Sequence, residues 1–151
     1  MTAKPYLSKL QQRETTTTQW PEFLATETER VIETGVHAAI LRIALGTEEP
    51  RVHDQAANLL RRKLDPTSSF SSHRDGTFTA LVVPLLGFVE LQARVTRLHS
   101  MFSQLRCSPT IGFALRREDE SLLDTMARAD ASVDRELFRR EDSGSLLVLP
   151  E

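Results

Sequence analysis

The segment between residues 70 and 84 constrains the fold of this chain more than any other. Two segments with strand-like sequence, Phe70–Arg74 and the more apolar Thr77–Pro84, are separated by the dipeptide Asp75-Gly76. Asp-Gly between two such segments is a strong signal for a tight turn joining antiparallel strands. Strands that alternate singly with helices would build a parallel sheet, whereas a hairpin makes an antiparallel pair. The sheet of this protein is therefore predicted to be mostly antiparallel.

Helical and strand patterns alternate on both sides of this hairpin. The helical patterns carry apolar residues at intervals of three and four, and the strand patterns are short apolar runs, most of them next to a glycine. The predicted helices span 20–34, 54–64, 88–105 and 118–140, and the other predicted strands span 36–45, 110–115 and 145–149. This order predicts an α+β fold with a ferredoxin-like, mostly antiparallel central sheet flanked by about four helices.

Composition limits the location and the partners of the chain. Its 151 residues suffice for one domain with its own core, and we divide them into a polar N-terminal tail, 1–18, and a globular domain, 19–151. A net charge of −2 provides no basic field for nucleic acid. There is neither an apolar run long enough to span a membrane nor a signal peptide, and the single Cys107 has no disulfide partner in the chain. We expect a cytoplasmic protein.

The usual signatures of catalysis and metal binding are missing from the sequence. The four histidines, at positions 37, 53, 73 and 99, are scattered without the spacing of metal ligands. The chain contains no glycine-rich phosphate loop, nucleophile elbow or Cys-x-x-Cys pair. The residues alone therefore predict no metal site and no cofactor.

Several segments resemble GGDEF domains, the diguanylate cyclase family. The run Pro109-Thr110-Ile111-Gly112-Phe113-Ala114 is similar to the Ser-Ile-Gly-Val-Ala strand of that family. Arg128-Ala129-Asp130-Ala131 is similar to the Arg-Ala-Asp run that opens its last helix segment. Asp75-Gly76-Thr77-Phe78 looks like an eroded signature hairpin, and Leu146-Leu147-Val148 looks like the closing strand. The resemblance spans about residues 20–150 and implies a GGDEF-like fold.

The resemblance also implies that the catalytic residues are lost. An active GGDEF domain condenses two GTP molecules into cyclic di-GMP, and phosphoryl transfer of this kind uses metal ions held by carboxylates. The positions of these carboxylates fall at Ala44, Gly76 and Thr77, and a phosphate-binding lysine falls at Leu137. None of the four residues has a charged side chain. The resemblance therefore implies no catalytic residue and no metal ligand.

The guanine-binding part is also shortened. Only nine residues separate Ala44 from Asp54, so the segment that carries the family's base-reading Asn is missing. Asp54 itself matches a base-reading Asp, although an N-cap of the predicted helix 54–64 is the favoured interpretation.

We therefore expect a catalytically inactive GGDEF-like domain, not an enzyme. It would act as a protein-interaction or regulatory module in bacterial cyclic di-GMP signalling, with another protein as its partner. The alternative is a receptor for cyclic di-GMP or a nucleotide, with a displaced site made of Arg61, Arg62, Asp65 and Arg74. An active nucleotidyl cyclase is the least favoured interpretation. Two further possibilities are an unrelated domain with a ferredoxin-like fold and the formation of a homodimer.

Overall fold

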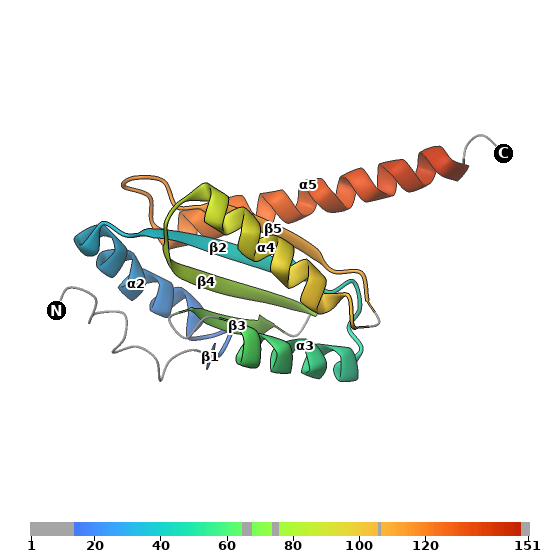
Figure 1. Ribbon diagram of the computed structural model, residues 1–151, viewed down its shortest axis with the longest axis horizontal. Coiled ribbons are helices and arrows are strands. Elements are labelled where there is room, and N and C mark those ends of the chain that lie inside the picture. The colour runs from blue at the N-terminus through green and yellow to red at the C-terminus, as the bar shows by residue number, and fades with distance from the viewer. Residues whose placement is uncertain (1–13, 65–67, 74–75, 106, 149–151) are drawn as a thin grey trace.

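The structure, a computed structural model, describes residues 14–64, 68–73, 76–105 and 107–148, with side chains as far as Arg139. Its strands are β1 (Glu14–Thr15), β2 (His37–Ala44), β3 (Ser69–His73), β4 (Thr77–Leu85) and β5 (Thr110–Leu115). Its helices are α2 (Trp20–Thr34), α3 (Pro50–Lys63), α4 (Phe88–Phe102) and α5 (Leu122–Val148). The strands form one sheet in the order β1-β3-β4-β2-β5 (Figure 1). The predicted α+β fold, with a mostly antiparallel sheet and four helices, is confirmed.

The segment from β2 to β5 has the βαββαβ connectivity of ferredoxin-like folds. β2 pairs antiparallel with both β4 and β5, and β3 pairs antiparallel with β4 through the predicted hairpin. Only the two-residue β1 runs parallel to its neighbour β3. Because the order places β5 at one end of the sheet, its outer side is an edge.

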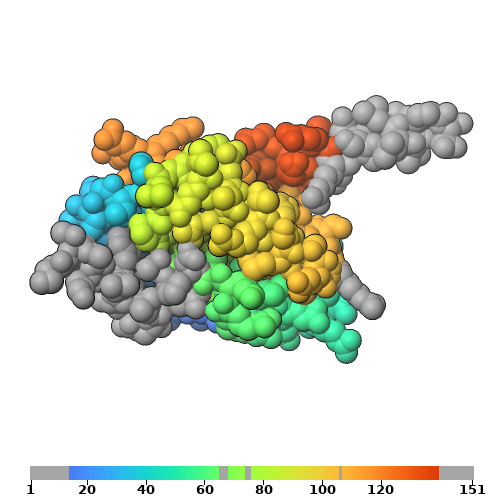
Figure 2. Space-filling model, viewed as in Figure 1, coloured from blue at the N-terminus to red at the C-terminus, as the bar shows by residue number. Residues whose placement is uncertain are grey.

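Each face of the sheet is covered by two helices, because side chains alternate between the faces along each strand. On β2, Leu41 and Ile43 belong to the core under α3 and α4, whereas Ala38 and Ile40 belong to the core under α2 and α5. Helices α3 and α4 lie side by side and cover the face seen in Figure 2. Among the described residues, no helix is long and apolar enough to cross a membrane.

The ends of α2 follow from its sequence. Pro21 lies in the first turn, where a backbone N–H would have no acceptor within the helix, so its absence costs no hydrogen bond. Gly35 ends the helix with a φ of 74°, a left-handed conformation that glycine adopts without steric cost, and its N–H bonds to the carbonyl of Val31.

α5 packs very closely on β5. A Cβ atom at Gly112 would lie 2.5 Å from Cγ2 of Val133 and 2.6 Å from the carbonyl oxygen of Ala129. Only glycine therefore lets the helix lie this close to the strand. Beyond this contact, the helix continues past the body of the domain (Figure 1).

Two predicted boundaries at the helix starts are wrong. α3 begins at Pro50 rather than at residue 54, so Asp54 lies inside the helix and is not its N-cap. Pro50 suits the first helical position, and Val52 adds a turn of buried apolar surface, which makes the earlier start favourable. α5 begins at Leu122, later than the predicted 118, after a turn in which Asp119 has a φ of 65°.

The predicted strand 145–149 is also wrong, because the structure shows α5 continuing to Val148. The turn expected at Gly144 does not form: a single glycine inside a helix costs about 1 kcal/mol and does not by itself end it. Helix 88–105 was predicted slightly too long, since α4 ends at Phe102. The predicted tail 1–18 contains β1, and residues 1–13 lie outside the described residues.

Candidate functional site

The eroded positions of the hairpin meet at one end of the sheet. Ala44, the last residue of β2, lies directly opposite Thr77, the first residue of β4. The N–H of Leu45 donates to the carbonyl of Gly76 at 3.1 Å, which ties the end of β2 to the turn. The structure thus brings together three of the four positions where the resemblance expects charged groups, and it finds a methyl group, a hydrogen atom and a hydroxyl there.

The short loop after β2 closes over this hairpin. A Cβ atom at Gly76 would lie 2.4 Å from the carbonyl oxygen of Thr47, closer than real Cβ atoms approach a neighbour. Gly76 also has a φ of +78°, which disfavours any side chain there. Position 76 therefore cannot take a carboxylate without moving the backbone of Thr47. Among the described residues, no group of three or more His, Cys, Asp or Glu side chains is placed to hold a metal ion.

Leu137, the fourth eroded position, lies on a different element. It follows Val133 by one turn of α5, and its side chain is 39% exposed. An apolar side chain at this position offers a phosphate group neither charge nor a hydrogen bond.

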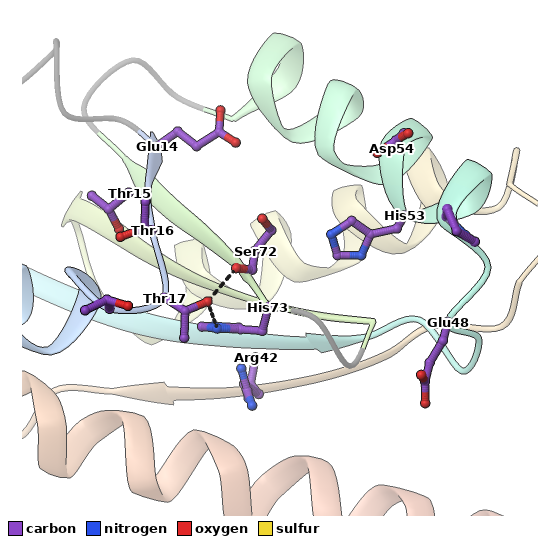
Figure 3. A pocket seen from close by; sticks show the side chains of 12 residues that line it. Glu14, Thr15, Thr16, Thr17, Arg42, Glu48, His53, Asp54, Ser72 and His73 are labelled. Atoms are coloured by element: carbon purple, nitrogen blue, oxygen red, sulfur yellow. Dashed lines mark hydrogen bonds between the residues drawn. The ribbon is translucent and has the colours of Figure 1, made fainter.

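An open cleft of about 1210 Å³ lies next to the hairpin. One wall is the lead-in, residues 14–18, and the opposite wall is the start of α3 with His53 and Asp54 (Figure 3). Ser72 and His73, at the end of β3, lie between the two walls. The cleft is lined by Glu14, Glu48 and Asp54 as well as by Arg42, so its lining carries charges of both signs and does not select for an anion.

A chain of hydrogen bonds runs across the sheet on the side of the cleft. Nη1 of Arg42 donates to Oγ1 of Thr79 at 2.7 Å, and Nε2 of His73 lies 3.0 Å from the same oxygen. Nδ1 of His73 lies 3.0 Å from Oγ1 of Thr17, which donates its own proton to the carbonyl of Ser72 at 2.9 Å.

The donor of each hydrogen bond in this series can be assigned in turn. The hydroxyl of Thr17 has only one proton, and Ser72 accepts it, so Nδ1 of His73 must donate to Thr17. In the neutral ring, Nε2 then accepts from the hydroxyl of Thr79. The polar chain (Arg42, Thr79, His73, Thr17) therefore anchors the lead-in to the centre of the sheet.

The Arg-Ala-Asp run has a structural role at this sheet. Asp130 forms an ion pair with Arg42, with 2.8 Å between Oδ1 and Nε, and Ala129 is fully buried. Nη2 of Arg128 donates to the carbonyl of Leu115 and to Glu120, both at 2.6 Å. The hydrogen bonds from Arg128 hold the pKa of Glu120 at about 2, below its ordinary value. The run thus fixes α5 to β2 and to the end of β5.

The residues predicted for a displaced ligand site are only partly described. Arg61 donates to both carboxylate oxygens of Glu14, at 2.7 and 3.0 Å, and this contact raises its pKa. Arg62 is exposed at the end of α3. Asp65 and Arg74 lie outside the described residues. The proposed site of these four residues therefore stays a prediction, with Arg61 already bound to the lead-in.

Sequence reasoning missed a basic group between α3 and α4. Burial lowers the pKa of Arg94, and the positive charge of Arg97 lowers it further. Arg94 also pairs with Glu90 on its own helix, with 2.8 Å between Nη2 and Oε2. The basic group consists of Lys63, Arg94 and Arg97, and it borders a small apolar pocket lined by Leu41, Leu64, Val82, Leu98 and Met101. Arg94 and Arg97 lie on α4 and Lys63 lies on α3, so only the packing of α3 against α4 adds Lys63 to the pair.

No protein-family model and no curated protein matches this chain. Solved structures do match it. A microbial GGDEF domain, solved in a novel mode of interaction with cyclic di-GMP, aligns with a TM-score of 0.72 at 13% identity, over 82% of this chain and 85% of that one. A sensory box/GGDEF family protein from Caulobacter crescentus aligns with a TM-score of 0.69 at 18% identity, over 80% of this chain and 90% of that one.

A third structure contains a regulatory partner. The diguanylate cyclase SiaD from Pseudomonas aeruginosa, in complex with its activator SiaC, aligns with a TM-score of 0.69 at 17% identity, over 78% of this chain and 53% of that one. At these identities the comparisons establish the fold alone. The chain has the fold of GGDEF domains, and the resemblance read from the sequence is confirmed at that level.

Proposed function

We propose that this chain is a non-catalytic GGDEF-fold module that regulates cyclic di-GMP signalling by binding another protein. The closed hairpin is the observation that carries the proposal. Ala44 and Thr77 supply no carboxylate, and a Cβ atom at Gly76 would clash with the carbonyl oxygen of Thr47, which leaves no room for one there. A metal-dependent condensation of GTP needs carboxylates at this place to hold the metal ions.

The residues that hold the scaffold together support a retained, non-catalytic fold. Arg128, Asp130 and Gly112 make close contacts between α5 and the sheet. These contacts give a stable surface, which is what a protein-binding module requires. The complex of SiaD with its activator SiaC supports regulation by a partner protein as a mode of action available to proteins that contain this fold.

A calorimetric titration tests the loss of the nucleotide site. GTP is titrated into the full chain in the presence of Mg²⁺, with an active diguanylate cyclase as the positive control. We expect no binding heat from this chain, because the positions that would hold the metal and the phosphates carry no charge. Saturable Mg²⁺-dependent binding of GTP would contradict the proposal.

A second candidate function is a cyclic di-GMP receptor at the basic group. The observation that favours it is that Lys63, Arg94 and Arg97 line one small pocket, where burial and, to a smaller extent, the positive charge of Arg97 lower the pKa of Arg94. A phosphate placed between these side chains would relieve that repulsion and accept charge-assisted hydrogen bonds.

The receptor is tested by titrating cyclic di-GMP into the wild type and into the double variant Lys63→Ala/Arg97→Ala. The receptor hypothesis predicts saturable binding that the double variant loses. Arg117→Ala is the matched control, since Arg117 is an exposed arginine in the loop before α5. Absence of binding to the wild type would exclude this candidate.

A further inference from the structure

The outer side of β5 offers backbone groups for pairing. The N–H of Arg116 donates to the carbonyl of Ala38 at 2.8 Å, so in this antiparallel pair the backbone groups of Ala114, Gly112 and Thr110 point toward β2. Those of Ile111, Phe113 and Leu115 point outward. Among the described residues, no strand pairs with this side of the sheet. Natural proteins usually cover such an edge or protect it with charges.

The outward groups specify how a second strand can pair. The carbonyl of Leu115 already accepts from Arg128, and Pro109 has no N–H to donate. Pairing therefore has to use the backbone groups of Ile111 and Phe113. It also has to place Leu115 of one strand opposite Pro109 of the other.

A second copy of β5 meets this condition. If it runs antiparallel with Gly112 opposite Gly112, then Ile111 of each copy lies opposite Phe113 of the other, and Pro109 lies opposite Leu115. The neighbouring antiparallel registers, shifted by two residues and centred on Ile111 or on Phe113, fail because they set Phe113 against Pro109 or Ile111 against Leu115. In the register centred on Gly112, the occupied carbonyl of Leu115 lies opposite Pro109, which has no N–H to donate.

The side chains on both faces of this edge fit the same register. On the α4 side, the two Ile111–Phe113 pairs form an apolar cluster, and Phe88, which contacts Phe113 and is 49% exposed, extends it. Val89 is 79% exposed next to Phe88. On the α5 side, the two Gly112 residues add no side chain, so the two α5 helices can approach each other over the paired strands.

The register with Gly112 opposite Gly112 implies a two-fold axis between the two strands. The charges along α5 are complementary about this axis. Arg128 lies on the edge side of the helix, since it reaches the outward carbonyl of Leu115, and Ser132 and Glu136 follow at intervals of four residues. Gly112 lies beneath Ala129 and Val133, so the axis passes close to the level of Ser132. An antiparallel second helix therefore places Glu136 opposite Arg128.

The expected crossing angle agrees with this contact. Each strand step turns a sheet by about −20 to −25°, and α5 contacts both β5 and β2, so the two helices lie roughly two steps apart. The result, about −40 to −50°, is the angle at which ridges of residues four apart interlock. Because Arg128 pairs with Glu120 and Glu136 pairs with Arg139 within each chain, the contact joins four charges of alternating sign.

We infer that two copies of this chain form a symmetric dimer through β5 and α5, with a continuous sheet across the interface. The inference goes beyond the proposed function and does not depend on it, because the edge of β5 is separate from the hairpin end of β2 and β4. The dimer leaves the cleft at the β3 side of the sheet open to other partners.

The mass of the full chain in solution, measured by analytical ultracentrifugation up to submillimolar concentration, tests this inference. We expect the wild type to reach twice the monomer mass. Glu136→Arg sets like charges opposite each other across the axis and should weaken the dimer by about tenfold or more. Asp134→Arg is the matched control, with the same change of charge on an exposed residue about 200° away around the helix.

Hydrogen exchange identifies the interface independently. The amides of Ile111 and Phe113 should exchange more slowly as the protein concentration rises, whereas those of Glu14 and Thr15 at the opposite edge should not change. Thermal unfolding of each variant verifies that it is folded. A wild type that stays monomeric, a dimer without protection of these two amides, or equal weakening by the two substitutions would each overturn the inference.

Discussion

Gly76 combines a left-handed backbone with a lack of space for a side chain. Gly35 has nearly the same φ, 74° against 78°, but no atom lies within 4 Å of a Cβ built there. The two glycines therefore separate the effect of backbone conformation from the effect of the contact with Thr47.

Replacing each of these glycines by alanine tests the closed hairpin. Gly35→Ala should lower the free energy of unfolding by about 1 kcal/mol, the cost of a left-handed alanine. Gly76→Ala should lower it by roughly 2–4 kcal/mol, because the methyl group also has to displace the backbone of Thr47. Urea unfolding at neutral pH measures both values. Equal destabilisation by the two substitutions would mean that the loop does not close on the hairpin.

Glu120 should make stability depend on pH. Its pKa in the folded protein is about 2, below the ordinary 4.5, so its contribution is complete above about pH 4.5 and is lost as the pH falls toward 2. Glu120→Gln should therefore cost on the order of 1–2 kcal/mol at pH 7 and progressively less below pH 4.5. Urea unfolding at several pH values measures this difference. Glu118→Gln, at an exposed neighbour, serves as the control, and a cost for Glu120→Gln that is independent of pH would argue against the ion pair.

At the level of residues, the sequence predicted the uncharged positions but not the contact of Thr47 with Gly76 that leaves no space for a side chain. Ala44, Gly76 and Thr77 could be assigned from their place relative to neighbouring motifs. The approach of Thr47 depends on the path of a short loop, which no local pattern specifies. His73 and Arg42 were missed as partners because Thr79 joins them only through the register of β2, β4 and β3.

The lead-in is the element whose attachment depends most on the polar chain. β1 contributes only two residues to the sheet, so Thr17 and its contact with His73 should decide how firmly the segment is held. Thr17→Val should increase the rate of amide exchange in residues 14–18, because the bonds to His73 and Ser72 are lost.

Thr18→Val provides the control for this substitution. Thr18 is exposed, and its hydroxyl makes no hydrogen bond within the described residues. Mass-spectrometric hydrogen exchange of the peptide that contains residues 14–18 compares the two variants. If both change the exchange equally, the polar chain does not anchor the lead-in.

At the level of elements, the strong apolar patterns were reliable and the chain ends were not. The hairpin, β2, β5 and α2 agree with prediction, because each is bounded by glycine or proline or has a long amphipathic pattern. The strand predicted at 145–149 failed, since four apolar residues in a row fit a strand and a helix alike. β1 could not be predicted, because two residues are too few for a strand pattern and are defined only by their pairing with β3.

In the whole molecule, the sheet separates two regions with different chemistry. At the end of β2 and β4, where the resemblance expects a metal site, Ala44, Gly76 and Thr77 carry no charged side chain and the loop at Thr47 closes over Gly76. At the β5 edge, backbone groups and apolar side chains are left for an interface. An end without charged side chains at these positions and an open edge at β5 are consistent with the proposed role in binding rather than in catalysis.

Turnover of GTP tests the central claim most directly. The full chain is incubated at high concentration with GTP and Mg²⁺ or Mn²⁺, and the nucleotides are separated by chromatography, with an active diguanylate cyclase as the positive control. The account predicts that GTP remains unchanged, because Ala44, Gly76 and Thr77 supply no carboxylate for a metal ion and Gly76 has no space for a side chain. Formation of cyclic di-GMP above the rate without protein would contradict it.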